Sequence, residues 1–299
     1  MDWLNYHHLL YFWTVVQEGS VTKACERLNL AQPTVSGQLR TLEKALGHEL
    51  FERSGRGLVL TEFGKMVADY AEDIFRTGRD LMAAVRHERT DRPMRLVVGV
   101  ADVVPKLVCS SVLEAAMELE RAVQLVIHEG KPDQLVAELG LHHLDLVIAD
   151  QPLAPASRVK AYNHLLGKST ITVFAPKGEA ERYANEFPAS LDGAPMLLPT
   201  VSTRMRRALD QWMRSHDLSP RLVAEVEDSA LLKVFGEHGY GLFVAPTVIA
   251  EDVETKYGVV PIGVIEDVTE RYYAISLERR VTHPAVLAIC ESSRQTLFT

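Results

Sequence analysis

Residues 32–40 place small polar side chains along one side of a predicted helix. The opposite side is apolar at steps of four, three and four, which is the spacing of a buried helical face: Val35, Leu39, Leu42 and Leu46. The polar side carries groups that both donate and accept hydrogen bonds: Gln32, Thr34, Ser36 and Gln38. A glutamine amide can bond adenine through two hydrogen bonds, and a hydroxyl group can bond several bases. The chemistry of this face is therefore suited to contact with the edges of DNA bases.

Positive charge and small residues accompany this polar face. Arg40 lies one turn further along the helix, where a phosphate or a guanine is within reach, and Pro33 suits the first helical turn. Gly37 costs about 1 kcal/mol relative to alanine inside a helix, so we expect the missing side chain to allow close approach to DNA. Two further arginines flank a glycine-rich turn and suit phosphate contact. The predicted DNA-binding residues are Gln32, Pro33, Thr34, Ser36, Gly37, Gln38, Arg40, Arg53 and Arg56.

The elements around this helix follow a recognisable order. An apolar stripe over residues 9–16 predicts a first helix that ends at Gly19, and Ser20 is a candidate N-cap for a second helix. After the polar helix, ELFERSGRGLVL predicts a small hairpin. Two helices, a turn, a third helix and a hairpin form a winged helix-turn-helix, whose last helix enters the major groove. The alternative, a solvated helix face beside a surface hairpin, does not account for the whole order.

Residues 61–88 form one long helical pattern with apolar residues near heptad spacing. We interpret this stripe as a dimer seam, because it is long and lies on an otherwise polar helix. Packing against its own domain is the alternative. Asp91, Arg92 and Pro93 then end the helix. The predicted seam consists of Phe63, Val67, Tyr70, Ile74 and Leu81.

From residue 93 the sequence pattern changes to short apolar runs, typical of strands, that alternate with predicted helices. Runs such as RLVVGVA, LDLVIAD and STITVFAP are apolar on both faces, which is typical of parallel sheets covered by helices. About 200 residues of this pattern exceed one small sheet, so we expect two α/β lobes with a cleft between them. A ligand is expected at the carboxyl ends of the strands.

The composition limits the class of protein. The net charge is −8, yet the first 92 residues balance 12 Lys and Arg against 13 Asp and Glu, so DNA contact is expected there rather than in the acidic remainder. The three cysteines lack metal-binding spacing, and no secretory signal or membrane-spanning run is present, which predicts a cytoplasmic protein without a membrane partner. No G-x-S-x-G, GxGxxG or P-loop motif supports an enzyme.

The segment LLYFWTVVQEGSVTKACERLNLAQPTVSGQLRTLEKALGHELFERSGRGLVLTEFG resembles the DNA-binding region of LysR-type transcriptional regulators. The rest of the chain resembles their effector domain, whose lobes are similar to periplasmic solute-binding proteins. The resemblance implies a cytoplasmic dimer, or dimer of dimers, that binds double-stranded operator DNA, responds to an effector and contacts RNA polymerase. It also implies a winged helix-turn-helix domain at 1–60, a linker helix and hinge at 61–92 and an effector domain at 93–299. Lobe one is expected at about 93–165 and 268–299, and lobe two at about 166–267.

The same resemblance places the effector at two turns, residues 101–104 and 200–203. Oxygen atoms dominate there and at nearby strand ends, which favours a hard cation or an ammonium group over an organic acid. Helix capping and local pairing are the alternative roles of these acids. No cofactor is predicted, only a small effector, either a monovalent cation or a metabolite. The predicted effector residues are Asp102, Val103, Glu129, Asp150, Thr200, Ser202, Thr203 and Asp228.

Several segments resemble a subgroup of the family that activates a sodium/proton antiporter gene, among them TVSGQLRTLEKALG and VGVADVVPKLVCSSVL. This closer resemblance implies an activator that responds to sodium or alkaline stress. A regulator of the same build that answers an organic metabolite is the first alternative. A two-lobed solute-binding protein or enzyme is an alternative from another class.

Overall fold

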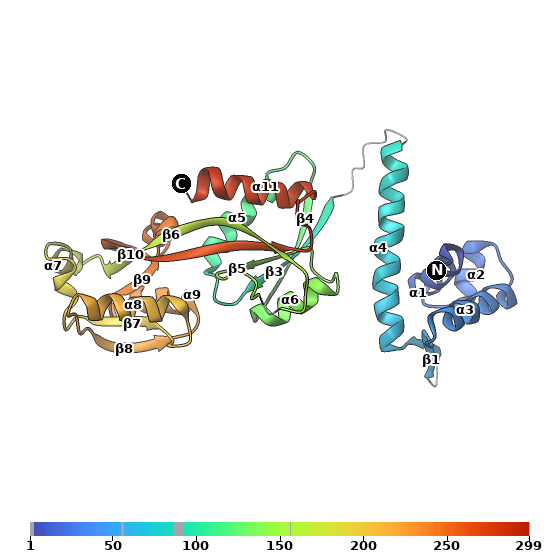
Figure 1. Cartoon of the computed structure of the whole chain (residues 1–299), viewed down its shortest axis with the longest axis horizontal. Helices are drawn as coiled ribbons and strands as arrows, with labels where there is room; N and C mark the ends of the chain where they lie inside the picture. Colours follow the sequence, from blue (N-terminus) through green and yellow to red (C-terminus); the bar gives the residue numbers. More distant parts are fainter. Residues whose placement is uncertain (1–2, 55–56, 86–92, 156, 299) are drawn as a thin grey trace. The chain divides into compact units, whose positions relative to one another are not determined.

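In the first part of the chain, apolar residues recur at helical spacing and glycines follow the ends of two helices. The computed structural model describes residues 3–54, 57–85, 93–155 and 157–298 (Figure 1). Contacts divide the chain into two units, residues 1–91 and 92–299, and each is described by itself. Within the described ranges, no helix combines the length and the apolar character needed to cross a membrane.

The first unit packs three helices around a small core, α1 (Tyr6–Glu18), α2 (Val21–Leu28) and α3 (Gln32–Leu46). Asn5 caps α1 by accepting from the backbone N–H groups of His7 and His8. Ser20 occupies the N-cap position of α2 but makes no side-chain cap bond, so that helix begins without the predicted cap. Glycines in the left-handed conformation end α1 and α3, at Gly19 and Gly47.

A hairpin and a long helix complete this unit. Strands β1 (Phe51–Ser54) and β2 (Gly57–Leu60) pair antiparallel, which gives the wing, and α4 (Glu62–Val85) follows. The Thr61 hydroxyl accepts from the Gly64 N–H at 2.9 Å and donates to the Glu49 carbonyl at 2.8 Å, so one side chain caps α4 and ties it to the residues before the wing. A β-carbon at Gly64 would lie 2.0 Å from the Leu50 carbonyl oxygen, so this close approach requires glycine.

Polar contacts join α1 to α4. The Trp13 indole N–H donates to Glu72 at 2.7 Å, and Arg79 pairs with the other oxygen of that carboxylate at 3.0 Å. The Arg79 guanidinium also lies 5.3 Å from the centre of the Trp13 ring. The first helix of the winged domain is therefore fixed to the long helix by a charged and aromatic cluster.

The predicted seam residues of α4 divide into two groups. Val67 is buried in the core of its own unit, and Phe63 and Ile74 pack against that core. Tyr70, between Val67 and Ile74 in the chain, is 40% exposed, and near the end of the helix Leu81 is 63% exposed and Met82 and Val85 are also exposed. One face of α4 thus packs within its own domain as far as Ile74, and the last turns of the helix present apolar side chains that a partner helix can cover.

The second unit is an α/β structure built on a mixed sheet. Six strands lie in the order β4-β3-β5-β10-β6-β9, and a separate pair β7-β8 extends the second lobe. The strand bounds are β3 Met94–Ala101, β4 Val123–Gly130, β5 Leu146–Ala149, β6 Tyr162–Pro176, β7 Pro195–Pro199, β8 Arg221–Val226, β9 Phe243–Pro246 and β10 Val259–Ser276. The helices are α5 Lys106–Met117, α6 Pro132–Gly140, α7 Ala180–Ala184, α8 Arg204–Ser215, α9 Ser229–Glu237, α10 Ala250–Tyr257 and α11 Pro284–Ser292.

Two long strands connect the lobes. β6 and β10 pair antiparallel along most of their length and run through both lobes (Figure 1). The expectation of parallel sheets is therefore wrong for these two strands, although it is right for β3, which pairs parallel with β4 and β5, and for β7, which pairs parallel with β8. The chain passes from lobe one to lobe two along β6 and returns along β10, so the two strands must run in opposite directions.

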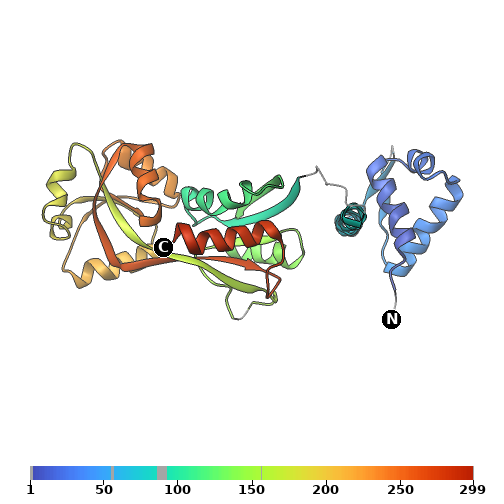
Figure 2. The same cartoon turned by 90° about the horizontal axis from the view of Figure 1, so that it is seen from above.

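Helices cover the sheet of lobe one on both sides. Figure 1 shows α6 on one side of this sheet and α11 on the other, and α11 packs beside α5 (Figure 2). One core cluster extends from lobe one toward β9 and α10, and another lies within lobe two. The carboxyl ends of β3, β5, β7 and β8 are followed by the turns and helix starts that form the pocket described below.

Candidate functional site

The polar face of α3 is open, as its sequence predicts. Val35, Leu39 and Leu42 are buried in the core of the unit. The side chains predicted to meet DNA lie away from the core, five of them exposed and two half-buried: Gln32, Pro33, Thr34, Gly37 and Arg40, with Ser36 and Gln38. The first turn contains no acidic residue, so nothing in that turn repels phosphate.

Gly37 lies at an open position of α3. A β-carbon there would meet no atom within 4 Å, so packing inside the domain does not explain the glycine. Its carbonyl accepts a 2.9 Å hydrogen bond from the Thr41 hydroxyl. Glu43 is the acid nearest to the polar face along the helix, and it accepts from the Leu50 N–H at 2.9 Å. The position of Gly37 is consistent with a requirement imposed from outside the domain.

The remaining two residues predicted to contact DNA phosphates are arginines of the wing segment. Arg53 belongs to β1, opposite Leu58 of β2. Arg56 lies outside the residues that the structure describes. The hairpin follows α3 closely in the chain, which is the arrangement of a winged helix-turn-helix.

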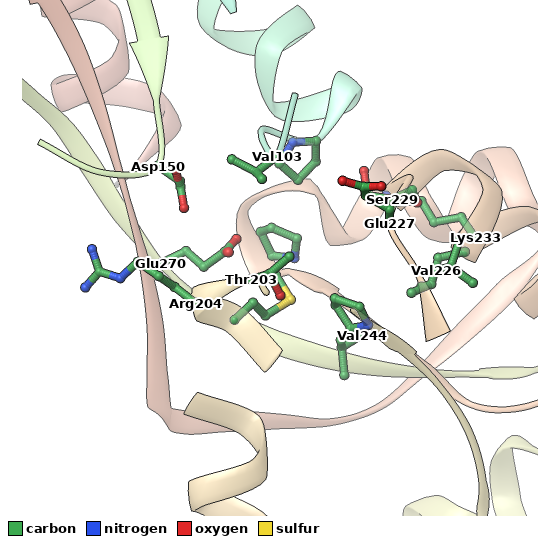
Figure 3. Close-up of a pocket in the computed structure, with 15 residues that line it drawn as sticks. Val103, Asp150, Thr203, Arg204, Val226, Glu227, Ser229, Lys233, Val244 and Glu270 are labelled. Atoms are coloured by element: carbon green, nitrogen blue, oxygen red, sulfur yellow. Dashed lines mark hydrogen bonds between the residues drawn. The ribbon is translucent and has the colours of Figure 1, made fainter. Parts of the chain in front are cut away.

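The second unit contains a pocket between its lobes (Figure 3). Lobe one contributes the turn after β3 and the end of β5, and lobe two contributes the ends of β7 and β8 and the first turns of α8 and α9. The wall is partly apolar and partly charged. Its residues include Val103, Asp150, Thr203, Arg204, Val226, Glu227, Ser229, Leu232, Lys233, Val244 and Glu270.

Two acids, Asp150 and Glu270, line one side of this pocket, and they also line an adjoining hollow beside α8. Burial raises the pKa of Asp150, and its buried Oδ1 atom has no hydrogen-bond partner. Burial also raises the pKa of Glu270 to about 7, and the neighbouring charge of Asp150 acts in the same direction. The Tyr272 hydroxyl donates to Glu270 at 2.7 Å and opposes this shift. Both carboxyls therefore favour the neutral state more than an exposed acid does.

Lys233 lies in the same wall and is 3% exposed. Its Nζ donates to the Ser229 carbonyl at 2.9 Å, one turn back along α9. Burial lowers the pKa of this lysine to about 8, although Asp228 and Glu270 favour its charged form. A lysine that is buried in this way is costly unless a negative group accompanies it.

An ionic bridge spans the two lobes beside the pocket. The Lys131 ammonium pairs with Asp102 at 2.7 Å in lobe one and with Glu227 at 3.2 Å in lobe two. The second oxygen of Asp102 is buried and unpartnered. Asp102 is thus held by a cation of the chain itself.

The remaining predicted effector residues have local partners. Glu129 pairs with Lys106 on the same lobe. Asp228 caps α9 through the N–H groups of Ala230 and Leu231, at 2.6 and 3.3 Å. The hydroxyls of Thr200 and Ser202 bond each other at 3.0 Å, and Thr203 caps α8.

The structure therefore brings only part of the predicted effector set together. Val103, Asp150 and Thr203 line the pocket. Asp102 lies beside it through Lys131, whereas Glu129 and Asp228 are engaged elsewhere. Sequence reasoning missed Lys233 and Glu270, although a lysine inside the apolar run ALLKVF was a usable signal. Among the described residues, no three His, Cys, Asp or Glu side chains form a group suited to a metal ion.

Comparison with known proteins agrees with this geometry. Residues 6–65 match the bacterial regulatory helix-turn-helix model of the LysR family, and residues 89–297 match the LysR substrate binding domain. The chain belongs to the LysR family. It is 36% identical over 299 residues to the transcriptional activator protein NhaR of Escherichia coli, covering 100% of this chain and 98% of that protein. The protein is thus a LysR-type transcriptional regulator.

Two further relatives illustrate the range of the family. The hydrogen peroxide-inducible genes activator of Escherichia coli strain CFT073 is 28% identical over 147 residues, 48% of each chain. The structure of a Corynebacterium glutamicum OxyR C206 mutant superimposes with a TM-score of 0.60 at 17% identity, over 97% of this chain and 91% of that one. The second comparison supports the fold alone.

Peroxide is expected to leave DNA binding by this chain unchanged. Cys25, Cys109 and Cys290 are buried, and burial raises the pKa of Cys109 to about 11 and that of Cys290 above its usual value. The thiolate is the form that peroxide oxidises, so the raised pKa values protect Cys109 and Cys290, and burial limits access of peroxide to Cys25. Thiol titration before and after peroxide treatment checks this, with urea-unfolded protein as the reactive control. Rapid loss of a thiol from the folded protein, together with altered binding, would contradict the expectation.

Proposed function

We propose that this chain is a cytoplasmic activator of a sodium/proton antiporter gene that responds to sodium or alkaline stress. The exposed polar face of α3 carries the DNA-binding part of the proposal, with Thr34 and Gln38 as readers of base edges. The 36% identity to the transcriptional activator NhaR over the whole chain supports the finer assignment. The pocket between the lobes serves as the effector site, and the chain has no catalytic role.

A dimer is the functional unit in this proposal. The exposed apolar side chains of the second half of α4, Leu81, Met82 and Val85, provide the surface for a partner helix. Two winged domains would then bind paired half-sites, as two-fold symmetric regulators do. Effector binding would change the placement of the two winged domains and thereby alter contact with RNA polymerase. The effector pocket and the DNA-binding domains would thus be coupled sites.

The pocket weighs against a direct site for a hard cation. Of the predicted acids, Asp102 is neutralised by Lys131, Glu129 by Lys106, and Asp228 is occupied as a helix cap. A response to alkaline conditions remains supported, because Glu270 titrates near neutrality in the pocket wall. An organic metabolite is the second candidate effector, and the apolar side chains of Val226 and Leu232 favour it.

Replacement of Gln38 by alanine tests the DNA-binding proposal. A bidentate amide contact to adenine contributes about 1–3 kcal/mol of discrimination, so we expect roughly a 5- to 150-fold loss of affinity for the upstream DNA of the chain's own gene. Gel-shift titration at several salt concentrations measures this loss, and binding to random DNA should change little. Gln211→Ala, at an exposed position of α8, is the matched control. Equal binding by Gln38→Ala and the parent would show that Gln38 is not one of the residues that read base edges.

A further inference from the structure

The pocket presents opposite charges on opposite sides. Figure 3 shows Asp150 and Glu270 on one side, with Arg204 beside them, and Lys233 and Ser229 on the other, with Glu227, which pairs with Lys131. Apolar side chains, among them Val103 and Val244, lie along the wall between them. A ligand that fills this pocket therefore meets two carboxyls at one end and, at the other, a lysine whose hydrogen bond goes to a backbone carbonyl.

The acidic side suits an organic ammonium group. The buried Oδ1 atom of Asp150 lacks a partner, and the oxygen of Glu270 that is not bonded to Tyr272 has acceptor capacity left. The described residues gather no third acid for a metal ion. An ammonium group donates up to three hydrogen bonds, so two carboxylates are sufficient partners for it.

The basic side suits a carboxylate. The Lys233 ammonium has three donors and gives one to the Ser229 carbonyl. It is 3% exposed, so water compensates its charge poorly, and its neighbours Val226 and Leu232 in the wall are apolar. A bound anion at this end would supply the direct ion pair that Asp228 and Glu270, which act on Lys233 only through their charge, do not form.

We propose that the pocket binds a small zwitterion whose ammonium group lies between Asp150 and Glu270 and whose carboxylate faces Lys233. The inference rests on the proposed role of this pocket as the effector site and names the class of its ligand. A plain organic acid is disfavoured by Asp150, Glu270 and Glu227. A plain amine leaves Lys233 without a direct ion pair. A molecule of the amino-acid class satisfies both ends and contributes no net charge to a buried site.

The proposed ligand also has a defined pH dependence. Binding of its ammonium requires Glu270 to ionise, so affinity should rise as the pH passes through about 7. Asp150, Arg204, Lys233 and Tyr272 are the charged and titratable groups that act on Glu270. Binding of the carboxylate requires protonated Lys233, with Asp228 and Glu270 nearby, so affinity should fall above about pH 8. The affinity maximum is therefore expected between these two values.

Calorimetric titration of the full-length protein with amino acids of increasing length tests the proposal. The probes are glycine, β-alanine, 4-aminobutyrate and 5-aminopentanoate, with butyrate and butylamine as analogues that carry a single charge. We expect at least one zwitterion to bind tenfold or more tightly than both analogues. A series in which no zwitterion exceeds them would overturn the proposal.

Two pocket variants test which residue binds the ammonium end of the ligand and which binds its carboxylate end. Glu270→Gln should reduce affinity for the best zwitterion at least tenfold and should not weaken butyrate binding, since it removes an acid that disfavours a plain carboxylate, whereas Lys233→Met should reduce affinity for both. Glu266→Gln, an exposed site on the same strand, is the control. Zwitterion binding that survives both pocket variants would overturn the proposal.

Gel shifts with the same proteins distinguish failure of the proposed ligand class from failure of the proposed regulatory function. Operator binding without zwitterion binding refutes the ligand class alone, and zwitterion binding without operator binding refutes the regulatory function.

Discussion

Replacement of Gly37 by arginine is expected to stabilise the free protein and to weaken its complex with operator DNA. Arginine favours a helix interior over glycine by about 0.8 kcal/mol. A β-carbon at this position meets no atom within 4 Å, so no steric cost offsets that gain. The free energy of unfolding of the winged domain should therefore rise, as measured by urea denaturation followed at helical circular dichroism.

The effect on DNA binding should have the opposite sign. Gly37 lies between Thr34 and Gln38 on the exposed face of α3, so a long side chain there would separate the helix from the floor of the groove. We expect about a tenfold loss of operator affinity, equivalent to about 1.4 kcal/mol. Affinity for random DNA should hold or increase, because the new guanidinium can reach a phosphate.

A matched variant distinguishes position from charge. Ala45 is exposed near the end of α3, and Ala45→Arg introduces the same side chain on the same helix away from Gly37. This variant should leave the ratio of operator to random-DNA affinity unchanged. If Gly37→Arg also left that ratio unchanged while stabilising the domain, close approach to the groove would not be the reason for the glycine.

The winged domain could be predicted from the sequence because its signals are local. The apolar stripe of α3, the glycine after it and the hairpin turn lie within about 30 residues, and each specifies its own element. The division of α4 could not be predicted in the same way. Val67 and Leu81 belong to one stripe, yet only the folded domain shows that Val67 is covered from within and Leu81 is not.

The pocket was predicted only in part because its residues meet through long-range pairing. Glu270 reaches the site through the return of β10 beside β6, which no local pattern indicates. The acids Asp102 and Glu129 looked similar in sequence, but each has a lysine partner whose proximity depends on the fold, Lys131 and Lys106. The strand ends in the sequence therefore predicted where the pocket lies. Which charged residues of the pocket lack an ion-pair partner could be seen only in the structure.

Replacement of Lys233 by methionine is expected to stabilise the protein at neutral pH. Burial lowers the pKa of Lys233 from 10.5 to about 8, and each pKa unit corresponds to about 1.4 kcal/mol, so the charged lysine costs about 3 kcal/mol when the protein folds. Methionine fills a similar volume without charge. Differential scanning calorimetry of the full chain at pH 7 should therefore show a higher melting temperature for Lys233→Met, whereas Lys256→Met, at an exposed position of α10, should show little change.

The pH dependence gives this prediction a definite sign. Below about pH 8 the lysine is charged in both the folded and the unfolded state, and the full cost of burial is present. Between about pH 8 and 10.5 the unfolded state binds more protons than the folded state, so the contribution of Lys233 to stability rises with pH. The advantage of Lys233→Met over the parent should therefore shrink across this range. An advantage that stays constant from pH 7 to 10.5 would show that Lys233 is not a buried cation. A variant that is more stable yet no longer responds to a zwitterion would indicate that the lysine is present for its ligand.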